Sequence, residues 1–266
     1  LFDHLKTNTY DILLFNLREI QNQFVGQIRQ LDDLKIWCID EFGNRKLDVD
    51  VIINPMIDNY YWNYKTEARI YCGAQYLVLD KKISEFHAKE KKINQVIQNV
   101  TISMGGVDVP GTTVKLVEWI GKEMGDVQLN VVLGGGFLWK EKLLSVVRDH
   151  KNIKVFENIS FLHEIFYASD VAVCAGGNTL HELAAIGVPT LVIPSMPHEV
   201  RNALAFQKQG FSFYCGDADT VCGDSFNDKL RMIKKYSVRK NMSDHGKKIA
   251  DGKGYQRICE LIKIFI

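Results

Sequence analysis

Short runs of apolar residues alternate with segments of helical periodicity along almost the whole chain. A strand buried on both faces of a parallel sheet is a continuous apolar run of about five residues, whereas a helix covering the sheet repeats its apolar positions every three or four residues. Apolar runs predict strands at residues 11–15, 34–39, 49–53, 127–133, 171–174 and 190–193, and a strand ending at Ile102. Periodic segments predict helices at residues 18–31, 113–124, 140–150, 178–186 and 199–209, with Val155 and residues 161–168 completing the series. This alternation predicts an α/β fold with doubly wound parallel sheets.

A polar stretch divides the pattern into two domains. Residues 81–98 are charged and partly helical, and the alternation of strands and helices restarts after them at Val100. We predict a partial amino-terminal Rossmann-like domain over residues 1–95 and a complete carboxyl-terminal one over residues 97–240. The tail, residues 241–266, ends in an amphipathic helix that we expect to pack back across the domains.

Composition and charge narrow the class of protein. The chain has 266 residues, of which 46% are hydrophobic and 24% charged, as a globular protein with a core requires. Lys and Arg number 33 against 32 Asp and Glu, so the net charge of +1 gives no electrostatic reason to expect a nucleic-acid partner. No apolar run approaches the roughly 20 residues of a membrane-spanning helix, and no secretory signal is present. We expect a soluble cytoplasmic protein and leave its oligomeric state open.

The cysteines are scattered, and no Cys-x-x-Cys pair suggests a zinc site. Several lie within apolar runs, which predicts reduced and mostly buried thiols in a cytoplasmic protein. Nothing in the sequence requires a metal or another cofactor. The six positions are Cys38, Cys72, Cys174, Cys215, Cys222 and Cys259.

Three glycine-rich turns follow predicted strands of the second domain. Open α/β sheets bind their ligands at the carboxyl ends of the strands, so these turns are the first candidates for a site. The glycine run of the second turn is a weak signal alone and is also compatible with a flexible strand exit. The turns are Ser103-Met104-Gly105-Gly106-Val107-Asp108, then Gly134-Gly135-Gly136, then Ala175-Gly176-Gly177-Asn178-Thr179.

The third turn is the most informative, because a helix begins directly after it. Glycines let backbone N–H groups approach a ligand, Asn178 or Thr179 can cap the helix, and the helix start favours a phosphate. Glu182, about one turn later, can accept hydrogen bonds from both hydroxyls of a ribose. A tight strand–helix turn in which Glu182 only stabilises the helix start explains the same residues equally well.

Other candidate chemistry is weaker. The chain has no G-x-x-x-x-G-K-[ST] and no G-x-G-x-x-G motif, so ordinary P-loop and dinucleotide sites lose their main support. Three histidines, His163, His181 and His198, lie near the same sheet edge and could serve in acid–base chemistry, but a structural or solvated role is favoured for each. An aromatic cluster is interpreted as packing between segments in preference to a sugar platform. It comprises Tyr60, Tyr61, Trp62 and Tyr64.

Taken together, the third turn and the residues after it resemble a known family. Residues 168–194 are similar to the UDP-binding carboxyl-terminal domain of GT-B glycosyltransferases, such as the enzyme that makes lipid II. The resemblance implies that the glycine turn holds a diphosphate and that Glu182 holds the ribose. In that family a Gln precedes an Asn-Ala pair by three residues. Asn202-Ala203 fits this pattern, but Glu199 stands at the Gln position.

Further segments resemble the hydrolases of the pseudaminic acid pathway and their spore-coat polysaccharide relatives. The first turn is similar to their Ser-Phe-Gly-Gly-x-Asp loop, which implies that Gly105, Gly106 and Asp108 line a cleft between the domains. The resemblance spans nearly the whole chain in the same order. The other matching segments are Ile39-Asp40-Glu41, Val49-Asp50 to Asn54, Gly73-Ala74-Gln75-Tyr76, Met242-Ser243 and Asp251-Gly252-Lys253-Gly254-Tyr255-Gln256-Arg257.

The chain also departs from this family. Members begin with a strand and a Gly-x-Gly-His-x-x-Arg loop whose His acts in catalysis, and no such motif is present. Asn16 and Glu41 stand where many members carry Asp. The chain opens Leu1-Phe2-Asp3-His4 without Met, which indicates a fragment or a processed product with an incomplete amino-terminal domain. No catalytic base can therefore be assigned to a residue of this sequence.

The resemblance implies a GT-B-like enzyme that hydrolyses a UDP-linked diacetamido-deoxy sugar at the anomeric carbon. Water attacks, UDP leaves and the configuration inverts, as a step of surface polysaccharide or nonulosonic acid biosynthesis. The alternatives are a GT-B glycosyltransferase that uses a UDP-sugar donor and a non-catalytic nucleotide-sugar-binding protein. The implied UDP and UDP-sugar contacts are Gly105, Gly106, Asp108, Gly134, Gly176, Gly177, Asn178, Thr179, Glu182, Glu199 and Asn202.

Overall fold

The computed structural model divides the chain into two compact units. Unit 1 comprises Leu1–Leu79 together with Lys253–Ile266, and unit 2 comprises Asp80–Gly252. Unit 1 is thus assembled from both ends of the chain. The structure describes residues 2–17, 21–31, 34–40, 43, 47–58, 64–148 and 150–266.

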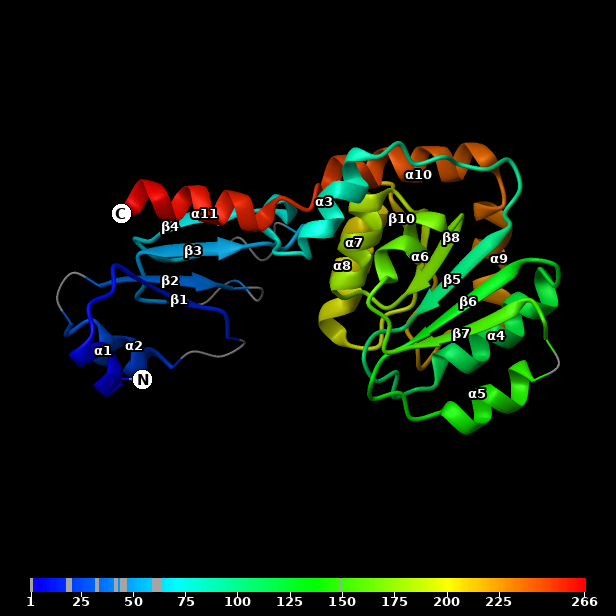
Figure 1. The fold of residues 1–266 in the computed structure, drawn as a ribbon, viewed down its shortest axis with the longest axis horizontal. Coiled ribbons are helices and arrows are strands. Elements are labelled where there is room, and N and C mark those ends of the chain that lie inside the picture. The colour runs from blue at the N-terminus through cyan, green and yellow to red at the C-terminus, as the bar shows by residue number, and fades with distance from the viewer. Residues whose placement is uncertain are drawn as a thin grey trace. The chain divides into compact units, whose positions relative to one another are not determined.

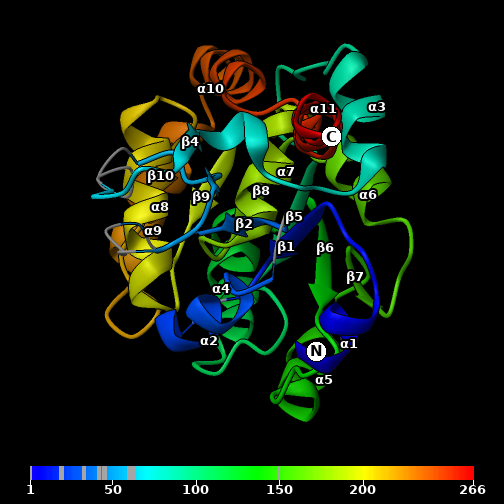
Figure 2. The ribbon, with the colours of Figure 1, turned by 90° about the vertical axis from the view of Figure 1, so that its left-hand side faces the viewer.

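Unit 1 is built on a four-stranded parallel sheet of order β1-β2-β3-β4. Side chains of β2 alternate between its faces: Ile36 and Cys38 pack with the helices α1 and α2, whereas Trp37 packs with Ile258 of α11. Helices therefore cover both faces (Figures 1 and 2). The elements are α1 (Phe2–Thr7), β1 (Ile12–Phe15), α2 (Asn22–Ile28), β2 (Lys35–Ile39), β3 (Val51–Asn54), β4 (Arg69–Cys72), the 3-10 helix η2 (Ala74–Tyr76) and α11 (Gly254–Phe265).

Unit 2 contains a six-stranded parallel sheet of order β10-β9-β8-β5-β6-β7. Its strands are β5 (Asn99–Ser103), β6 (Gln128–Leu133), β7 (Ile153–Glu157), β8 (Val171–Cys174), β9 (Thr190–Val192) and β10 (Ser212–Tyr214). Its helices are α3 (Lys81–Ala88), α4 (Thr112–Glu123), α5 (Lys140–Val147), α6 (Leu162–Ala168), α7 (Asn178–Ile186), α8 (Pro197–Lys208), α9 (Gly223–Ile233) and α10 (Tyr236–Ile249). Helices α3, α6, α7 and α10 pack together on one side of the sheet, and α4, α5 and α9 pack on the other (Figure 1). The predicted α/β fold with parallel sheets is confirmed.

The chain order creates a topological switch in this sheet. The strands after β5 add on one side as β6 and β7, and the chain then returns to place β8, β9 and β10 on the other. β5 consequently pairs with both β6 and β8, with Ser103 opposite Cys174 at the carboxyl end. Such a switch is where an open α/β sheet opens a crevice for a ligand.

The division between units differs from the one expected from the polar stretch. The sequence placed it near residues 95–97, but residues 80–98 belong to unit 2, with the His87 ring 2.9 Å from the Ala185 carbonyl of α7. The buried guanidinium of Arg239 donates hydrogen bonds to the carbonyls of Asn94 and Gln95. The polar stretch is therefore bonded to unit 2, although most of its residues are exposed.

Lys91 also binds the polar stretch to the rest of unit 2 through hydrogen bonds. Its ammonium donates to the carbonyls of Tyr167, in the last turn of α6, and of Ser169, the C-cap residue, at 2.5 and 2.7 Å. Burial lowers the pKa of Lys91 to about 8. The segment after α3 is therefore fastened to the sheet by charged side chains that composition alone would place in solvent.

Candidate functional site

The three glycine-rich turns lie at one edge of the unit 2 sheet. They follow β5, β6 and β8, which are parallel neighbours, so their carboxyl ends point the same way. The turns after β5 and β8 border the topological switch. The structure therefore brings together all the loops that the sequence singled out.

The start of α7 forms the centre of the site. Gly177 is its N-cap residue and provides no side-chain hydrogen bond, so Asn178 and Thr179 lie inside the first turn and do not cap it. This corrects the expectation that one of them would be the cap. Because no side-chain cap satisfies them, the N–H groups of the first turn stay available to an anion.

Gly176 holds the turn against helix α8. A Cβ atom at Gly176 would lie 2.5 Å from the carbonyl oxygen of Glu199, so only glycine allows this close approach. The buried side chain of Asn202 donates a hydrogen bond to the Gly176 carbonyl. Both predicted ligand contacts, Gly176 and Asn202, therefore fix the position of the turn.

Glu199 caps helix α8. Its Oε2 accepts hydrogen bonds from the N–H groups of Ser195 at 2.9 Å and Met196 at 3.1 Å. Its Oε1 would lie 3.4 Å from a Cβ at Gly177, so the carboxylate sits beside the start of α7. This capping role is one that a side chain at the third helical position can reach, and the ligand contact expected for Glu199 stays a prediction.

Glu182 is the one acidic group of the site with an unused carboxylate. No hydrogen bond or ion pair of Glu182 is found among the described residues, although the side chain is largely buried. Burial, and to a smaller extent the charge of Asp80, raise the pKa of Glu182 to about 7. A buried acceptor without a partner costs free energy, and a ligand that brings hydroxyl groups would satisfy it.

The histidines near this edge have structural surroundings. His181 is 3% exposed, neither ring nitrogen has a hydrogen-bond partner, and the ring lies edge-on to Phe206 with centroids 4.8 Å apart. Burial lowers the pKa of His181 to about 4, so the ring is neutral near pH 7. His163 is buried beside Phe86, and His198 is exposed at the start of α8.

The first and second turns are packed against each other. A Cβ at Gly134 would lie 2.5 Å from the Gly105 carbonyl, and the N–H of Gly136 donates to the Gly106 carbonyl at 2.9 Å. Packing between the loops therefore requires glycine at position 134, whereas a Cβ at Gly105, Gly106 or Gly135 would meet nothing within 4 Å.

Asp108 acts as a helix cap. Its two carboxylate oxygens accept hydrogen bonds from the N–H groups of Thr112 at 2.9 Å and Thr113 at 2.8 Å, and the residue is buried. Asp108 therefore has a structural role at the start of α4, and its expected place beside a substrate stays a prediction. Its spacing of four residues before a Thr pair is the signal that could have shown this.

Unit 1 carries a separate hydrogen-bonded group at the carboxyl ends of β2 and β3. The Tyr64 hydroxyl donates to Oδ2 of Asp40 at 2.8 Å and accepts from Nδ2 of Asn54 at 2.7 Å. Asp40 and Asn54 are buried, and burial raises the pKa of Tyr64. These contacts give Tyr64 a packing role, while Tyr60, Tyr61, Trp62 and Glu41 lie outside the described residues.

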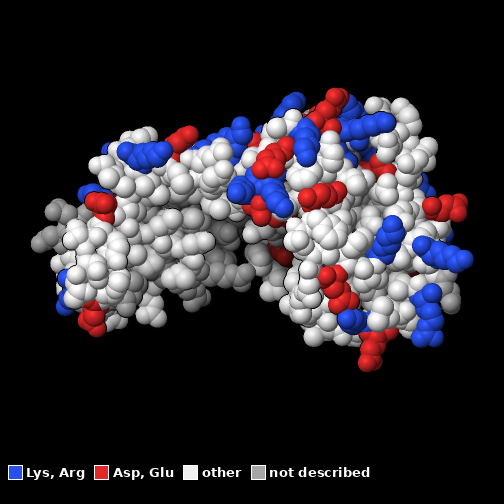
Figure 3. Space-filling model, viewed as in Figure 1, with Lys and Arg blue, Asp and Glu red and all other residues white. Residues whose placement is uncertain are grey.

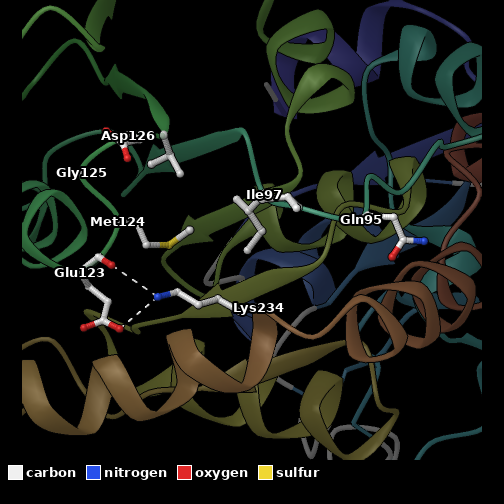
Figure 4. A pocket seen from close by; sticks show the side chains of 9 residues that line it. Gln95, Ile97, Glu123, Met124, Gly125, Asp126 and Lys234 are labelled. Atoms are coloured by element: carbon white, nitrogen blue, oxygen red, sulfur yellow. Dashed lines mark hydrogen bonds and ion pairs between the residues drawn. The ribbon is translucent and has the colours of Figure 1, made fainter.

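Pockets occur at both edges of the unit 2 sheet. One of about 360 Å³ lies at the carboxyl edge and is lined by Pro194, Ser195, Met196, Pro197, Val200, Arg201 and Asp217. Another of about 420 Å³ lies at the amino edge (Figure 4), where Nζ of Lys234 is 3.0 Å from Oε1 of Glu123. The smaller pocket adjoins the start of α8, which Glu199 caps, and lies at the same sheet edge as the glycine turns. We therefore consider it, and not the larger pocket, part of the candidate site.

In the part of the chain that the structure describes, neither a cluster of charge nor a group of cysteines forms a second candidate site. On the face drawn in Figure 3, basic and acidic side chains are interspersed. Within the described ranges, no group of three or more His, Cys, Asp or Glu side chains could hold a metal ion. All six cysteines are free, but only three of them are buried, fewer than expected. Among the described residues, no helix is long and apolar enough to cross a membrane.

Comparison with known proteins places this geometry in context. The family model of the glycosyltransferase family 28 C-terminal domain matches residues 111–253. The spore coat polysaccharide biosynthesis protein SpsG of Bacillus subtilis is 23% identical over 265 residues, covering 97% of this chain and 78% of that protein. A UDP-N-acetylglucosamine–N-acetylmuramyl-(pentapeptide) pyrophosphoryl-undecaprenol N-acetylglucosamine transferase of Acetivibrio thermocellus is 25% identical over 168 residues, covering 60% of this chain but only 45% of that enzyme.

Solved structures share the fold. Acinetobacter baumannii MurG superposes with a TM-score of 0.72 at 15% identity, covering 98% of this chain and 76% of MurG. A putative UDP-N-acetylglucosamine 2-epimerase of Listeria monocytogenes superposes with a TM-score of 0.68 at 15% identity, covering 98% of this chain and 76% of that chain. The fold is therefore GT-B-like, as the sequence predicted.

Proposed function

Because the chain belongs to the glycosyltransferase family 28 C-terminal domain family, we propose that it binds a UDP-sugar through unit 2 and acts at the anomeric carbon. The observation that carries the proposal is the start of α7, where Gly177 supplies no side-chain cap and Glu182 has no partner among the described residues. The free N–H groups and the helix dipole suit the diphosphate. The Glu182 carboxylate suits the two ribose hydroxyls, since it can accept a hydrogen bond from each.

Transfer of the sugar to an acceptor hydroxyl is the reaction that we propose first. The relative from Acetivibrio thermocellus is named for such a transfer, and the relative from Bacillus subtilis is named for polysaccharide biosynthesis. The acceptor oxygen bonds to the anomeric carbon, the bond from that carbon to the diphosphate oxygen breaks, and UDP leaves. The N–H groups of Asn178 and Thr179 stabilise the charge on the departing diphosphate. We assign the base that takes the acceptor proton to the amino-terminal domain.

Hydrolysis of the same bond by water is the second candidate. Two of the segments that resemble the pseudaminic acid pathway hydrolases, residues 73–76 and 251–257, are joined where Arg257 donates to the Gln75 carbonyl at 2.9 Å. A Cβ at Gly254 would lie 2.5 Å from the carbonyl carbon of Leu77. Packing within unit 1 is therefore enough to explain these motif residues. They support an architecture shared with the hydrolases, but they do not favour hydrolysis, so transfer remains the first proposal.

Calorimetric titration with UDP, UDP-N-acetylglucosamine and CDP tests the binding part. We expect UDP binding by the wild-type chain, and at least about tenfold weaker binding by Glu182→Gln, which loses the charged acceptor. His198→Ala is the matched control, because this side chain is exposed at the start of α8. Equal affinity for UDP in wild type and Glu182→Gln would refute the assignment.

The reaction is tested on the intact gene product. UDP-N-acetylglucosamine and a UDP-diacetamido sugar are incubated with and without a candidate acceptor, and UDP release is measured. Release that depends on the acceptor supports transfer, and release at the same rate without it supports hydrolysis. Tight UDP binding without any release would identify a non-catalytic nucleotide-sugar-binding protein.

A further inference from the structure

The larger pocket of unit 2, which we call the amino-edge pocket, lies away from the glycine turns. Its volume is about 420 Å³, and it is lined by the segment before β5, the turn between α4 and β6, and Lys234 at the end of α9. The strands are parallel, so residues before β5 and β6 lie at the sheet edge opposite to the glycine turns. A pocket of this size is large enough for a small organic molecule, since ligand pockets span about 300–1,000 Å³.

Apolar side chains form the floor of the amino-edge pocket. Ile97 and Val127 belong to the hydrophobic core of unit 2, and Met124 packs against that core. Val96 adds an apolar side chain that is 71% exposed. Figure 4 shows Ile97 and Met124 between Asp126 and Lys234. The apolar part of a ligand would remove these side chains from water, which favours its binding.

The walls of the amino-edge pocket are held by hydrogen bonds. Nδ2 of Asn152 donates to the carbonyls of Gly125 at 2.9 Å and Val127 at 2.7 Å, which fixes the turn before β6. On the other wall, the buried guanidinium of Arg239 donates to the Gln95 carbonyl at 3.0 Å. A ligand therefore meets preformed walls and loses little affinity to ordering of the protein.

Asp126 is a charged lining residue without a partner. Nζ of Lys234 donates to Oε1 of Glu123 at 3.0 Å and to its main-chain carbonyl at 3.4 Å, and Nε of Arg231 lies 3.5 Å from the same Oε1. Glu123 is thus neutralised by two cations. No hydrogen bond or ion pair of Asp126 is found among the described residues. The pocket consequently offers one unpaired carboxylate beside an apolar floor.

We propose that the amino-edge pocket binds a small organic cation, namely a primary ammonium group attached to an apolar body. The ammonium donates hydrogen bonds to the Asp126 carboxylate, and the apolar body lies on Val96, Ile97 and Met124. Lys234 repels the ammonium from the other end of the floor, so the two charges fix the direction of the ligand. Binding here is independent of UDP, because the pocket and the glycine turns lie at opposite edges of the sheet.

Three probes that share one apolar body separate the effect of charge from that of burial. n-Pentylamine, n-pentanol and pentanoate are cationic, neutral and anionic at pH 7. Each is titrated into the isotope-labelled whole chain, and the amide resonances of Gly125 and Asp126 are followed by NMR. We expect saturable binding of n-pentylamine in the millimolar range, and at least about tenfold weaker binding of the other two probes.

Variants of the two recognition elements test the assignment. Asp126→Asn should lower the affinity for n-pentylamine by at least about tenfold and bring it close to that for n-pentanol, because an amide does not balance the charge. Val96→Ser should weaken both probes alike, by about threefold, because it removes apolar contact. Both replaced side chains are exposed, so we expect both variants to fold, which circular dichroism checks.

Asp219→Asn is the matched control. Asp219 is an exposed carboxylate in the turn after β10, at the opposite edge of the same sheet, and its replacement changes the net charge by the same amount. This variant should bind n-pentylamine as the wild type does.

Three outcomes would overturn the proposal. One is a wild-type chain whose resonances do not shift to saturation with n-pentylamine. Another is pentanoate that binds as tightly as n-pentylamine or more so, which would make Lys234 the anchor and the ligand an anion. The third is an Asp126→Asn variant that binds n-pentylamine as well as wild type, or an Asp219→Asn control that loses affinity equally.

Discussion

The side-chain amide of Asn202 donates a hydrogen bond to the main-chain carbonyl of Gly176, which ties helix α8 to the turn before α7. Both residues are buried, so the bond cannot be replaced by water without rearrangement. The position of the turn therefore depends on a residue that lies 26 positions later in the chain.

Replacing Asn202 by Ala should weaken both folding and UDP binding. The Gly176 carbonyl loses its donor in a buried place, which costs about 1–3 kcal/mol in the free energy of unfolding. Without this link the α7 start is less well ordered, and we expect UDP affinity to fall severalfold. Urea unfolding and calorimetry measure the two effects, and His198→Ala on the same helix should change neither. An unaltered urea midpoint for Asn202→Ala would show that the bond contributes nothing.

Replacement by alanine should lower the stability of the protein at one glycine of the predicted loops and leave it nearly unchanged at another. At Gly176 a Cβ would lie 2.5 Å from the Glu199 carbonyl, so Gly176→Ala must push α8 away at a cost of about 1–3 kcal/mol. At Gly135 nothing lies within 4 Å of the added Cβ, and Gly135→Ala should stay within about 0.5 kcal/mol of wild type. Thermal unfolding compares the pair directly. Equal melting temperatures would contradict the packing described for Gly176.

Glu182 should link UDP binding to pH. Burial and Asp80 raise its pKa to about 7, and only the carboxylate can accept hydrogen bonds from both ribose hydroxyls. Apparent UDP affinity should thus be full above pH 7 and fall by about tenfold per pH unit below it. Glu182→Gln should show a weaker affinity whose pH profile reflects only the titration of UDP. A wild-type profile identical to that of Glu182→Gln would exclude the link.

The same shift makes Glu182 unfavourable for folding above pH 7. A carboxyl whose folded pKa is raised above its unfolded value of 4.5 holds its proton more tightly when folded, so its contribution is present below pH 4.5 and is lost as pH rises through 7. Glu182→Gln should therefore stabilise the ligand-free chain at pH 8 by about 1–3 kcal/mol and leave it nearly unchanged at pH 4.5. Urea unfolding at both pH values measures this difference.

Glu199→Gln should strengthen UDP binding. The Glu199 carboxylate lies beside Gly177, where it repels a diphosphate, and a Gln oxygen can still accept from the Ser195 and Met196 N–H groups. We expect affinity to rise about threefold to tenfold at low ionic strength, and less at high salt. Glu118→Gln, an exposed residue of α4, controls for the change in net charge. A weaker complex with Glu199→Gln would show that this carboxylate contacts the ligand.

Hydrophobic periodicity predicted much of this fold because the central unit 2 strands, such as β8 and β9, are buried on both faces. Strands such as β8, in which all four residues are buried, appear in the sequence as continuous apolar runs. The short strands β4 and β10 were missed: β10 has three residues of which only Ser212 is buried, and β4 has none that is fully buried. Helix α9 was missed although its buried residues Phe226, Leu230 and Ile233 repeat at helical spacing.

The sequence predicted that the three glycine turns gather at one sheet edge, but it did not predict the contacts that their residues make. The gathering follows from topology alone, because each turn comes after a strand of the same parallel sheet. The capping roles of Asp108 and Glu199 depend on which N–H groups fold next to each carboxylate. Gly134 and Gly176 are glycines because of backbone atoms brought close by the tertiary fold. The spacing of residues along the sequence does not predict those contacts.

Unit 1 combines residues 1–79 with residues 253–266, so the ribosome makes its two parts at different times. Ile258 of α11 completes the face of the unit 1 sheet around Trp37 and Val51, and it leaves the ribosome after all of unit 2. Residues 80–252 can form their own core while translation continues, whereas the earlier strands must wait for the final helix with an apolar face in water. We therefore expect unit 1 to mature last and to be the part that chaperones protect.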